Sequence, residues 1–474
     1  MNSPKRRRRR GVILTRQGFF KLQAAKSHAE RCENEGICYT LEGLSDRTGL
    51  DPDTLTKVLG CEIGVDKRTL HRCFRAFNLV LEPTDYKLPQ SEETISTEHS
   101  SQNRKSKIKE RINWGEAPDV SVFYGRTEEL ATLRHWILEE HCRLLTLLGI
   151  AGMGKTCLSV KLAEQIQDKF EFIIWRSLLP ALPIQEFIAE LIQFLSNGQE
   201  VDLPGTLYSK ISRLIHDLRA SRCLLIFDNV EAILQGCELQ ETECNNYAGS
   251  YCNGYEGYGE LLKCIGELPH QSCLVLTSRE KPKEIRLLEG EKLPVRVLHV
   301  KGLQVLDIQD IFRGKGSFWG SSVDWHSLTE CYAGNPLALK VVSTVIQNFF
   351  DGNIAEFLNQ DTVIFGEIFN LVEQQIDRLS ATEKEVINRL VLNRHSVSFS
   401  ELRGQMSSSV SAQNLLEALE SLEARSLIEK QSARFALQPI VRKYSTYRLI
   451  EQKIKKVQQQ VFADDEYQFI IGKN

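Results

Sequence analysis

A glycine-rich stretch limits the folds open to this chain of 474 residues more than any other feature. Residues Gly149–Thr156 read GIAGMGKT and satisfy the pattern G-x-x-x-x-G-K-[ST]. The apolar run Arg143–Leu148 precedes it and has the character of a buried strand, and the apolar residues from Leu158 to Ile166 fall on one face of a helix. A strand, this loop and a helix in succession predict an α/β domain.

Four further apolar runs have the composition of strands that are buried on both faces. They are Phe172–Trp175, Cys223–Phe227, Cys273–Leu276 and Val297–Val300. Helical patterns separate most of these runs, so we predict a parallel five-stranded sheet with helices on both sides. From about Leu303 onward helical periodicity dominates, until the hairpin-like stretch Leu427–Phe435. Short helices followed by a small hairpin predict a winged helix.

The glycine-rich loop is also a candidate phosphate site. Its glycines let backbone N–H groups turn toward phosphate oxygens, and the next helix presents the positive end of its dipole. Lys155 would supply a positive charge for the β- and γ-phosphates, and the Thr156 hydroxyl would be a ligand for Mg²⁺. We expect nucleotide contacts from Gly149, Ile150, Ala151, Gly152, Met153, Gly154, Lys155, Thr156 and Cys157.

Two polar residues that follow buried strands indicate the same site. Asp228 ends the third run, where the carboxyl ends of parallel strands face the ligand crevice, and it can hold Mg²⁺ through water. Arg279 follows the fourth run and can reach a γ-phosphate as a bidentate donor. For each residue the alternative is a solvated loop side chain. The candidate catalytic residues are Lys155, Asp228 and Arg279, and the candidate metal ligands are Thr156 and Asp228.

Taken in order, these motifs resemble the NB-ARC family of the STAND class of P-loop NTPases, over roughly Trp114–Tyr447. The resemblance rests on an entry motif at Phe123–Glu128 (FYGRTE), the P-loop, a second-strand motif at Phe170–Leu178, a Walker B strand at Leu224–Asp228, a sensor at Thr277–Arg279 and a GNPLAL motif at Gly334–Leu339. It implies that Arg126 and Pro336 lie near the nucleotide. It also implies that the sensor strand lies between the P-loop and Walker B strands.

Three departures from the family pattern affect the expected chemistry. Asn229 follows Asp228 where relatives often carry a second acid, which should slow hydrolysis; Glu231 is nearby in the sequence. The family's Met-His-Asp motif appears as Leu437-Gln438-Pro439, so Gln438 would take the place of the histidine near the β-phosphate and could donate a hydrogen bond but not titrate. Relatives usually continue into a repeat array that acts as a sensor, and the sequence shows none.

Patterns and resemblance together divide the chain into six segments. We predict a helix-turn-helix-like module with a basic arm (1–86), a polar linker (87–113), a P-loop NTPase domain (114–302), a helical subdomain (303–378), a winged helix (379–450) and a C-terminal tail (451–474). The stretch Cys237–Glu260 is rich in Gly, Tyr and Asn, and a surface insertion explains it better than a metal site because its cysteines are widely spaced.

The amino-terminal segment has the helix start and stop signals of an all-α helix-turn-helix module. Leu41–Leu59 reads as two helices joined at Gly49, and a third helix places three arginines on one face. These are Arg68, Arg72 and Arg75, which could meet phosphates, and residues 6–10 are all arginine. Such modules also mediate protein contacts, and bacterial members of the family that the chain resembles carry adaptor modules of this kind. Both DNA and protein are therefore candidate partners.

Composition excludes several other classes of protein. A hydrophobic fraction of 42% and a charged fraction of 26% are ordinary for a globular chain, and no apolar run is long enough to cross a bilayer. The first 111 residues are net basic and the rest net acidic, which suggests different tasks. The 13 cysteines lack Cys-x-x-Cys spacing, so we expect reduced, mostly buried thiols in a cytoplasmic protein without a membrane partner.

These observations lead to one main hypothesis and two alternatives. The main hypothesis is a signalling or defence switch that binds ADP or ATP with Mg²⁺, hydrolyses ATP slowly, and opens and forms a homo-oligomer in its ATP-bound form. A separate chain would serve as sensor or effector. The first alternative is a transcription regulator whose nucleotide domain controls DNA binding. The second is a P-loop kinase or metabolic ATPase, which the winged-helix pattern does not favour.

Overall fold

The computed structural model describes most of the chain. The described residues are 11–15, 18–19, 21–22, 25–26, 29, 39, 41–60, 65–87, 111–196, 205–234, 248–360, 366–393, 395–408 and 410–471. The predicted basic arm, residues 88–110 of the predicted linker and residues 237–247 of the predicted insertion lie outside them. The chain forms two compact units, Met1–Ser100 and Ser101–Asn474.

The described part of the smaller unit includes three short helices. They are α2 (Leu41–Thr48), α3 (Pro52–Gly60) and α4 (Lys67–Ala76), and their core includes Leu44, Leu55, Leu70 and Phe74. Asp66 caps α4 by accepting a hydrogen bond from the backbone N–H of Arg68. The unit is not all-α as predicted, because β1 (Ile13–Leu14) pairs antiparallel with β2 (Tyr86–Lys87). Two-residue strands are too short to show an alternating pattern in the sequence.

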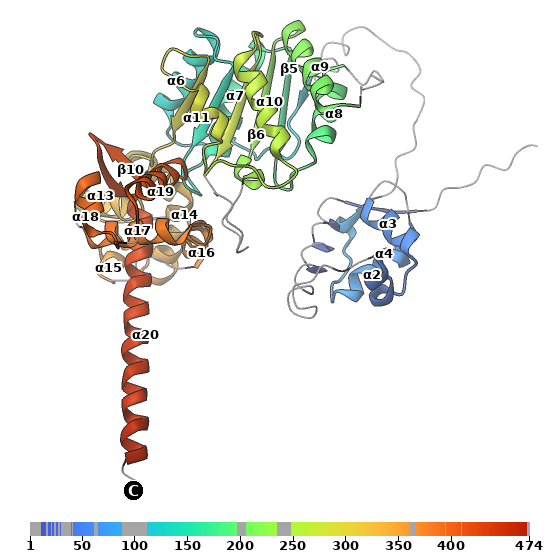
Figure 1. Cartoon of the computed structure of the whole chain (residues 1–474). Helices are drawn as coiled ribbons and strands as arrows, with labels where there is room; N and C mark the ends of the chain where they lie inside the picture. Colours follow the sequence, from blue (N-terminus) through green and yellow to red (C-terminus); the bar gives the residue numbers. More distant parts are fainter. Residues whose placement is uncertain are drawn as a thin grey trace, which may run out of the picture. The chain divides into compact units, whose positions relative to one another are not determined.

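The larger unit contains a parallel sheet of six strands, with helices on both of its faces (Figure 1). The strands lie in the order β3-β5-β6-β7-β4-β8. Their bounds are β3 Ile112–Asn113, β4 Leu144–Leu148, β5 Phe172–Ser177, β6 Cys223–Asp228, β7 Cys273–Ser278 and β8 Val295–His299. The prediction of five strands missed β3, an edge strand of two residues that pairs with β5. The strand before Arg279, β7, lies between β4 and β6, as the resemblance implied.

Helices cover both faces of this sheet because the side chains of each strand alternate between two hydrophobic cores. Leu145 and Leu147 pack in one core, with α6 (Thr127–Leu138) and α7 (Lys155–Ile166). Leu144 packs in the other core. The helices on that side are α8 (Ile184–Leu195), α9 (Leu207–Ala220), α10 (Glu256–Glu267) and α11 (Lys283–Leu288). The sheet is therefore buried on both faces, as its continuous apolar runs predicted.

The rest of the larger unit is mainly helical. Its helices are α12 (Val305–Arg313), α13 (Ser322–Cys331), α14 (Pro336–Phe349), α15 (Ile354–Leu358), α16 (Gly366–Asp377), α17 (Ala381–Leu392), α18 (Phe399–Gln405), α19 (Ala412–Ala424) and α20 (Pro439–Ile471). A small antiparallel sheet has the order β10-β11-β9, with β9 at Val397–Ser398, β10 at Ile428–Gln431 and β11 at Arg434–Leu437. One core runs from the first face of the large sheet through α14 to α17 and α19.

Two findings concern the expectations for membrane-spanning segments and for the cysteine thiols. In the part of the chain that the structure describes, no helix combines the length and the apolar character needed to cross a membrane. The thiols of Cys73, Cys142, Cys223 and Cys273 are buried and form no disulfide. Burial raises the pKa of the Cys142 thiol to about 11, which keeps it protonated and unreactive near neutral pH.

Candidate functional site

The glycine-rich loop joins the carboxyl end of β4 to the first turn of α7. Gly152 and Gly154 have φ angles of 80° and 83°, in the left-handed region that favours glycine. An added Cβ at Gly152 would lie 2.7 Å from Asn335 Oδ1, so the loop also needs glycine there because α14 begins beside it. Gly154 is thus a pattern glycine that the backbone requires, and Gly152, at a position that the pattern leaves free, is a second one that this chain requires.

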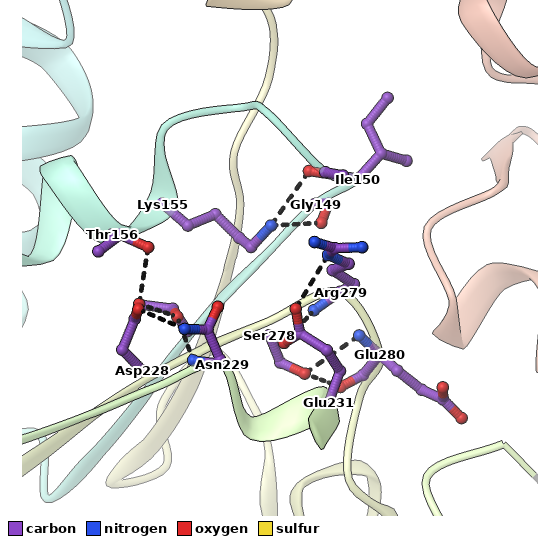
Figure 2. A network of polar contacts seen from close by, with 12 residues as sticks. Gly149, Ile150, Lys155, Thr156, Asp228, Asn229, Glu231, Ser278, Arg279 and Glu280 are labelled. Atoms are coloured by element: carbon purple, nitrogen blue, oxygen red, sulfur yellow. Dashed lines mark hydrogen bonds and ion pairs between the residues drawn. The ribbon is translucent and has the colours of Figure 1, made fainter. Parts of the chain in front are cut away.

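Lys155 is the first residue of α7 and is 8% exposed. Its Nζ donates to the carbonyl oxygens of Gly149, at 2.8 Å, and Ile150, at 3.0 Å (Figure 2). Burial lowers the pKa of the ammonium to about 8, and the carboxylates of Glu231 and Asp228 oppose this shift. The ammonium is thus held inside the loop in which an anion would be bound.

Asp228 lies at the end of β6 and is 2% exposed. Its Oδ1 accepts hydrogen bonds from Thr156 Oγ1, at 2.8 Å, and from Thr277 Oγ1, at 2.5 Å. Its Oδ2 accepts one from Asn229 Nδ2 at 2.9 Å. Burial raises the pKa of Asp228, and the two threonine hydroxyls oppose this shift. The hydroxyl and carboxylate oxygens of Thr156 and Asp228 are the kind of donor that Mg²⁺ prefers.

Arg279 follows β7 and pairs with Glu231, a residue of the short turn after β6. Its Nε lies 2.9 Å from Glu231 Oε1, and its backbone N–H donates to Glu231 Oε2 at 3.2 Å (Figure 2). Asn229 starts this turn with a φ of 60°, and Asn tolerates that left-handed conformation better than most residues. The turn therefore directs Glu231, rather than Asn229, toward the arginine.

These groups open onto one cavity of 330 Å³. Its lining combines polar and apolar side chains. The polar ones include Lys155, Thr156, Asn229, Glu231, Thr277 and Arg279, and the apolar ones are Val122, Phe123, Tyr124, Leu303, Ile311, Pro336 and Leu337. A cavity whose lining joins phosphate-binding groups with apolar side chains suits a nucleotide.

Two buried residues connect the loop to its surroundings. Arg126 is 6% exposed, pairs with Glu129 at 2.6 Å and donates to the carbonyl oxygen of Met153 at 3.0 Å. Asn335 caps α14 by accepting from the N–H groups of Leu337 and Ala338, and its Nδ2 donates to the carbonyl oxygen of Ala151 at 2.8 Å. The entry motif and the GNPLAL motif therefore both contact the loop.

The structure brings most of the predicted site residues together. Arg126, Ala151, Gly152, Met153, Gly154, Lys155, Thr156, Cys157, Arg279 and Pro336 line the cavity. Gly149 and Ile150 contribute the carbonyl groups that hold Lys155, and Asp228 reaches the cavity through Thr156. Gln438 is not among the lining residues; its backbone bonds with Leu427 and Arg442, and its role stays a prediction.

Sequence reasoning did not assign several residues that the structure places at the site. Glu231 was noted only as a nearby acid, yet it lines the cavity. Thr277 and Asn335 belong to the sensor and GNPLAL motifs, and these motifs are the sequence signal for both residues. Leu303, Ile311 and Lys340 also line the cavity. We find no sequence signal that would have assigned these three.

A known family model matches the part of the chain that contains the glycine-rich loop. Residues 126–236 match the family model of the NB-ARC domain. Over 358 residues the chain is 47% identical to an uncharacterized WD repeat-containing protein of Nostoc sp. (strain PCC 7120), covering 73% of this chain and 28% of that protein. It is 30% identical over 118 residues to an uncharacterized protein of Mycobacterium bovis, and the match covers 25% of this chain and 28% of that protein. The chain thus spans less than a third of the length of these curated relatives.

Two solved structures are similar to the larger part of the chain. One is a signal transduction ATPase with numerous domains (STAND) from Pyrococcus horikoshii that has a tetratricopeptide repeat sensor; identity is 19%, the TM-score is 0.35, and 69% of this chain and 43% of that chain are covered. The other is a Walker-type ATPase of Pyrococcus abyssi. Identity is 15%, the TM-score is 0.45, and the match covers 68% of this chain and 96% of that chain.

Proposed function

Because the chain carries a P-loop NTPase domain of the NB-ARC family, in the STAND class, we propose that it is a signalling switch controlled by ADP and ATP. The observation that carries the proposal is the single cavity in which Lys155, Thr156 and Arg279 meet an apolar wall that contains Pro336. In its resting form the chain would hold ADP, and exchange for ATP would open it.

Each polar residue has a role in this proposal. Backbone N–H groups of the loop and the Lys155 ammonium bind the β- and γ-phosphates. Thr156 and Asp228, whose oxygens lie 2.8 Å apart, would hold Mg²⁺, which neutralises phosphate charge when bound. Arg279 would contact the γ-phosphate of ATP. Arg126 and Pro336 would frame the base and sugar.

Hydrolysis should be slow. Asn229 stands where a second acid would activate water, and its side chain is engaged with Asp228 and Ser177. An amide cannot accept a proton in the way a carboxylate can. A switch needs a long-lived triphosphate state, so slow turnover suits this role better than that of a motor.

Contacts between the two lobes of the larger unit support a closed resting form. We call β3–β8 and their helices the sheet lobe, and α17–β11 with the start of α20 the C-terminal lobe. The backbone N–H of Lys281, two residues after Arg279, donates to Ala424 at 2.9 Å, and Glu280 pairs with Arg425 at 3.1 Å. ATP binding would separate these lobes and expose surfaces for self-association. Gln438 would contribute to closure beside the β-phosphate.

Element order supports the remaining domain assignments. In the C-terminal lobe it is α17, β9, α18, α19, β10, β11, and this alternation with an antiparallel hairpin suits a winged helix at 379–450. The helices α12–α16 would form the helical subdomain. In the smaller unit α2 and α3 meet at Gly49, whose φ is 66°, as a helix-turn-helix module requires.

The sensor and the cell compartment are part of the proposal. The name of the Nostoc relative records WD repeats. We propose that a repeat-containing sensor or effector controls this switch in the cytoplasm.

Nucleotide content tests the main proposal. Protein purified without added nucleotide should retain ADP, and Lys155→Ala should lose it because the loop then lacks its only ammonium. The control is Lys169→Ala, which removes an exposed lysine in the turn after α7. Denaturation followed by chromatography of the released nucleotides gives the occupancy. Equal occupancy in wild-type and Lys155→Ala protein would contradict the assignment.

A second candidate function is DNA binding through the smaller unit. It rests on the exposed positions of Arg68, Arg72 and Arg75 along α4. Filter binding of the full chain at two salt concentrations, with and without Arg72→Ala and Arg75→Ala, separates the candidates. Sequence preference and a steep salt dependence that the substitutions reduce would favour a regulator. Absence of binding would leave the module as a protein adaptor.

A further inference from the structure

Both carboxylate oxygens of Glu231 contact the same residue, Arg279. Oε1 lies 2.9 Å from the side-chain Nε of Arg279, and Oε2 accepts from the backbone N–H of the same arginine at 3.2 Å. The Glu231 side chain is 11% exposed and that of Arg279 is 30% exposed. A pair with two contacts and partial shielding from solvent is stronger than an exposed ion pair.

This pair lies in the cavity lining, close to the Lys155 ammonium. Glu231, Arg279 and Lys155 all line it, and Figure 2 shows Glu231 and Arg279 on the side of the loop toward which the Lys155 ammonium points. Among the charged neighbours of Lys155, Glu231 affects its pKa most. The arginine assigned to a γ-phosphate is thus already bound to a carboxylate.

We propose that Glu231 determines the preference between ADP and ATP by occupying the arginine that a γ-phosphate requires. This inference rests on the proposed nucleotide switch and assigns a specificity-determining residue within it. ADP leaves the Arg279–Glu231 pair intact because it has no γ-phosphate. A triphosphate must take Arg279 away from Glu231 and must also tolerate the negative charge of Glu231 nearby. Both effects weaken ATP binding relative to ADP.

A different role for the same carboxylate is activation of the attacking water. The observed geometry favours control of Arg279 over activation of water, since Oε1 pairs with the Arg279 side chain and Oε2 accepts from its backbone N–H. The two roles predict opposite results for a neutral replacement. Removing a gate tightens the triphosphate complex, whereas removing a base slows turnover and leaves binding unchanged.

Calorimetry on four proteins tests the proposal: wild type, Glu231→Gln, Arg279→Gln and the double variant, all stripped of nucleotide. Each is titrated with Mg-ADP and with a non-hydrolysable ATP analogue that carries an imido bridge. Glu231→Gln should bind the analogue about fivefold more tightly and change ADP affinity less than twofold. Arg279→Gln should weaken analogue binding, and in the double variant the gain from Glu231→Gln should shrink because its partner is gone.

A matched control uses a similar ion pair outside the cavity. Arg176 Nε and Glu190 Oε1 lie 2.8 Å apart, and Glu190→Gln should leave both affinities unchanged. An unchanged ratio of analogue to ADP affinity in Glu231→Gln would overturn the proposal, and loss of turnover in that variant would then identify Glu231 as the base. A wild-type protein that binds neither nucleotide would instead refute the proposed function itself.

Discussion

At the scale of single residues, Gly152 and Gly154 allow a controlled comparison. Both have left-handed φ angles, so alanine strains the backbone at either position by about 1–2 kcal/mol. A Cβ at Gly152 would also lie 2.8 Å from Leu337 Cβ, whereas one at Gly154 would meet only Pro336, at 4.0 Å. Gly152→Ala should therefore lower the midpoint of thermal unfolding of the stripped protein more than Gly154→Ala. Equal shifts would mean that α14 can move away freely.

Cys157 offers a chemical probe of cavity occupancy. It lines the cavity and is partly exposed, and burial raises the pKa of its thiol. Because the thiolate is the reactive form, alkylation by iodoacetamide should be slow at pH 7 and faster as the pH rises toward 9. Mg-ADP should suppress it. Peptide mass spectrometry measures the rate, and Cys157→Ser identifies the signal. Labelling that ADP does not affect would place the nucleotide elsewhere.

The residue scale also shows what a sequence can and cannot reveal about the site. The loop and Thr156 were assigned because the pattern is local. Glu231 was not assigned, because its partner Arg279 lies 48 residues away and only the pairing of β6 with β7 brings them together. The sequence identifies Asn229 as a departure from the family pattern, but not its hydrogen bond to Ser177, because Ser177 lies on the neighbouring strand β5.

At the scale of elements, Asn335 couples a helix cap to the phosphate loop. Asn335→Ala removes the cap of α14, which costs about 1 kcal/mol, and also the hydrogen bond to Ala151. The control is Ser321→Ala, which removes the cap of α13 at an exposed position outside the cavity lining. Asn335→Ala should lower ADP affinity as well as the thermal midpoint, and Ser321→Ala should lower only the midpoint. Calorimetry and thermal unfolding measure both, and a normal ADP affinity in Asn335→Ala would contradict the coupling.

The elements differ in how far the sequence predicts them. Each of the five predicted strands appears within two residues of its expected bounds, since runs buried on both faces cannot be confused with surface. The strands that were missed, β1, β2, β3 and β9, have two residues each and pair through backbone groups that any residue supplies. The left-handed turn at Asn229 that orients Glu231 also has no clear pattern in the sequence.

At the scale of the whole larger unit, one buried charge cluster joins the sheet lobe to the C-terminal lobe. Glu280 follows Arg279 directly, and its side chain is 3% exposed. It pairs with Arg425 at 3.1 Å, and Arg425 lies 3.6 Å from Glu383 in the C-terminal lobe. Burial raises the pKa of Glu280, and Arg425 opposes that shift more than any other charged group. The residue beside the proposed γ-phosphate sensor is thus tied to the opposite lobe.

Removal of Arg425 should open the lobes. Arg425→Met removes the cation that Glu280 and Glu383 share and leaves Glu280 with Arg378, 3.8 Å away, and breaking a buried pair costs up to about 3–5 kcal/mol. Glu280→Gln should cost less, because Arg425 keeps Glu383 as a partner. We expect the midpoint of the first unfolding transition to fall most in Arg425→Met, and small-angle scattering to show a larger radius of gyration with ADP bound. The exposed pair Arg434–Glu401, 3.0 Å apart within the C-terminal lobe, supplies the control Arg434→Met. If Arg425→Met keeps the dimensions of the wild type, the cluster does not hold the lobes together, and closure must depend on the apolar core that they share.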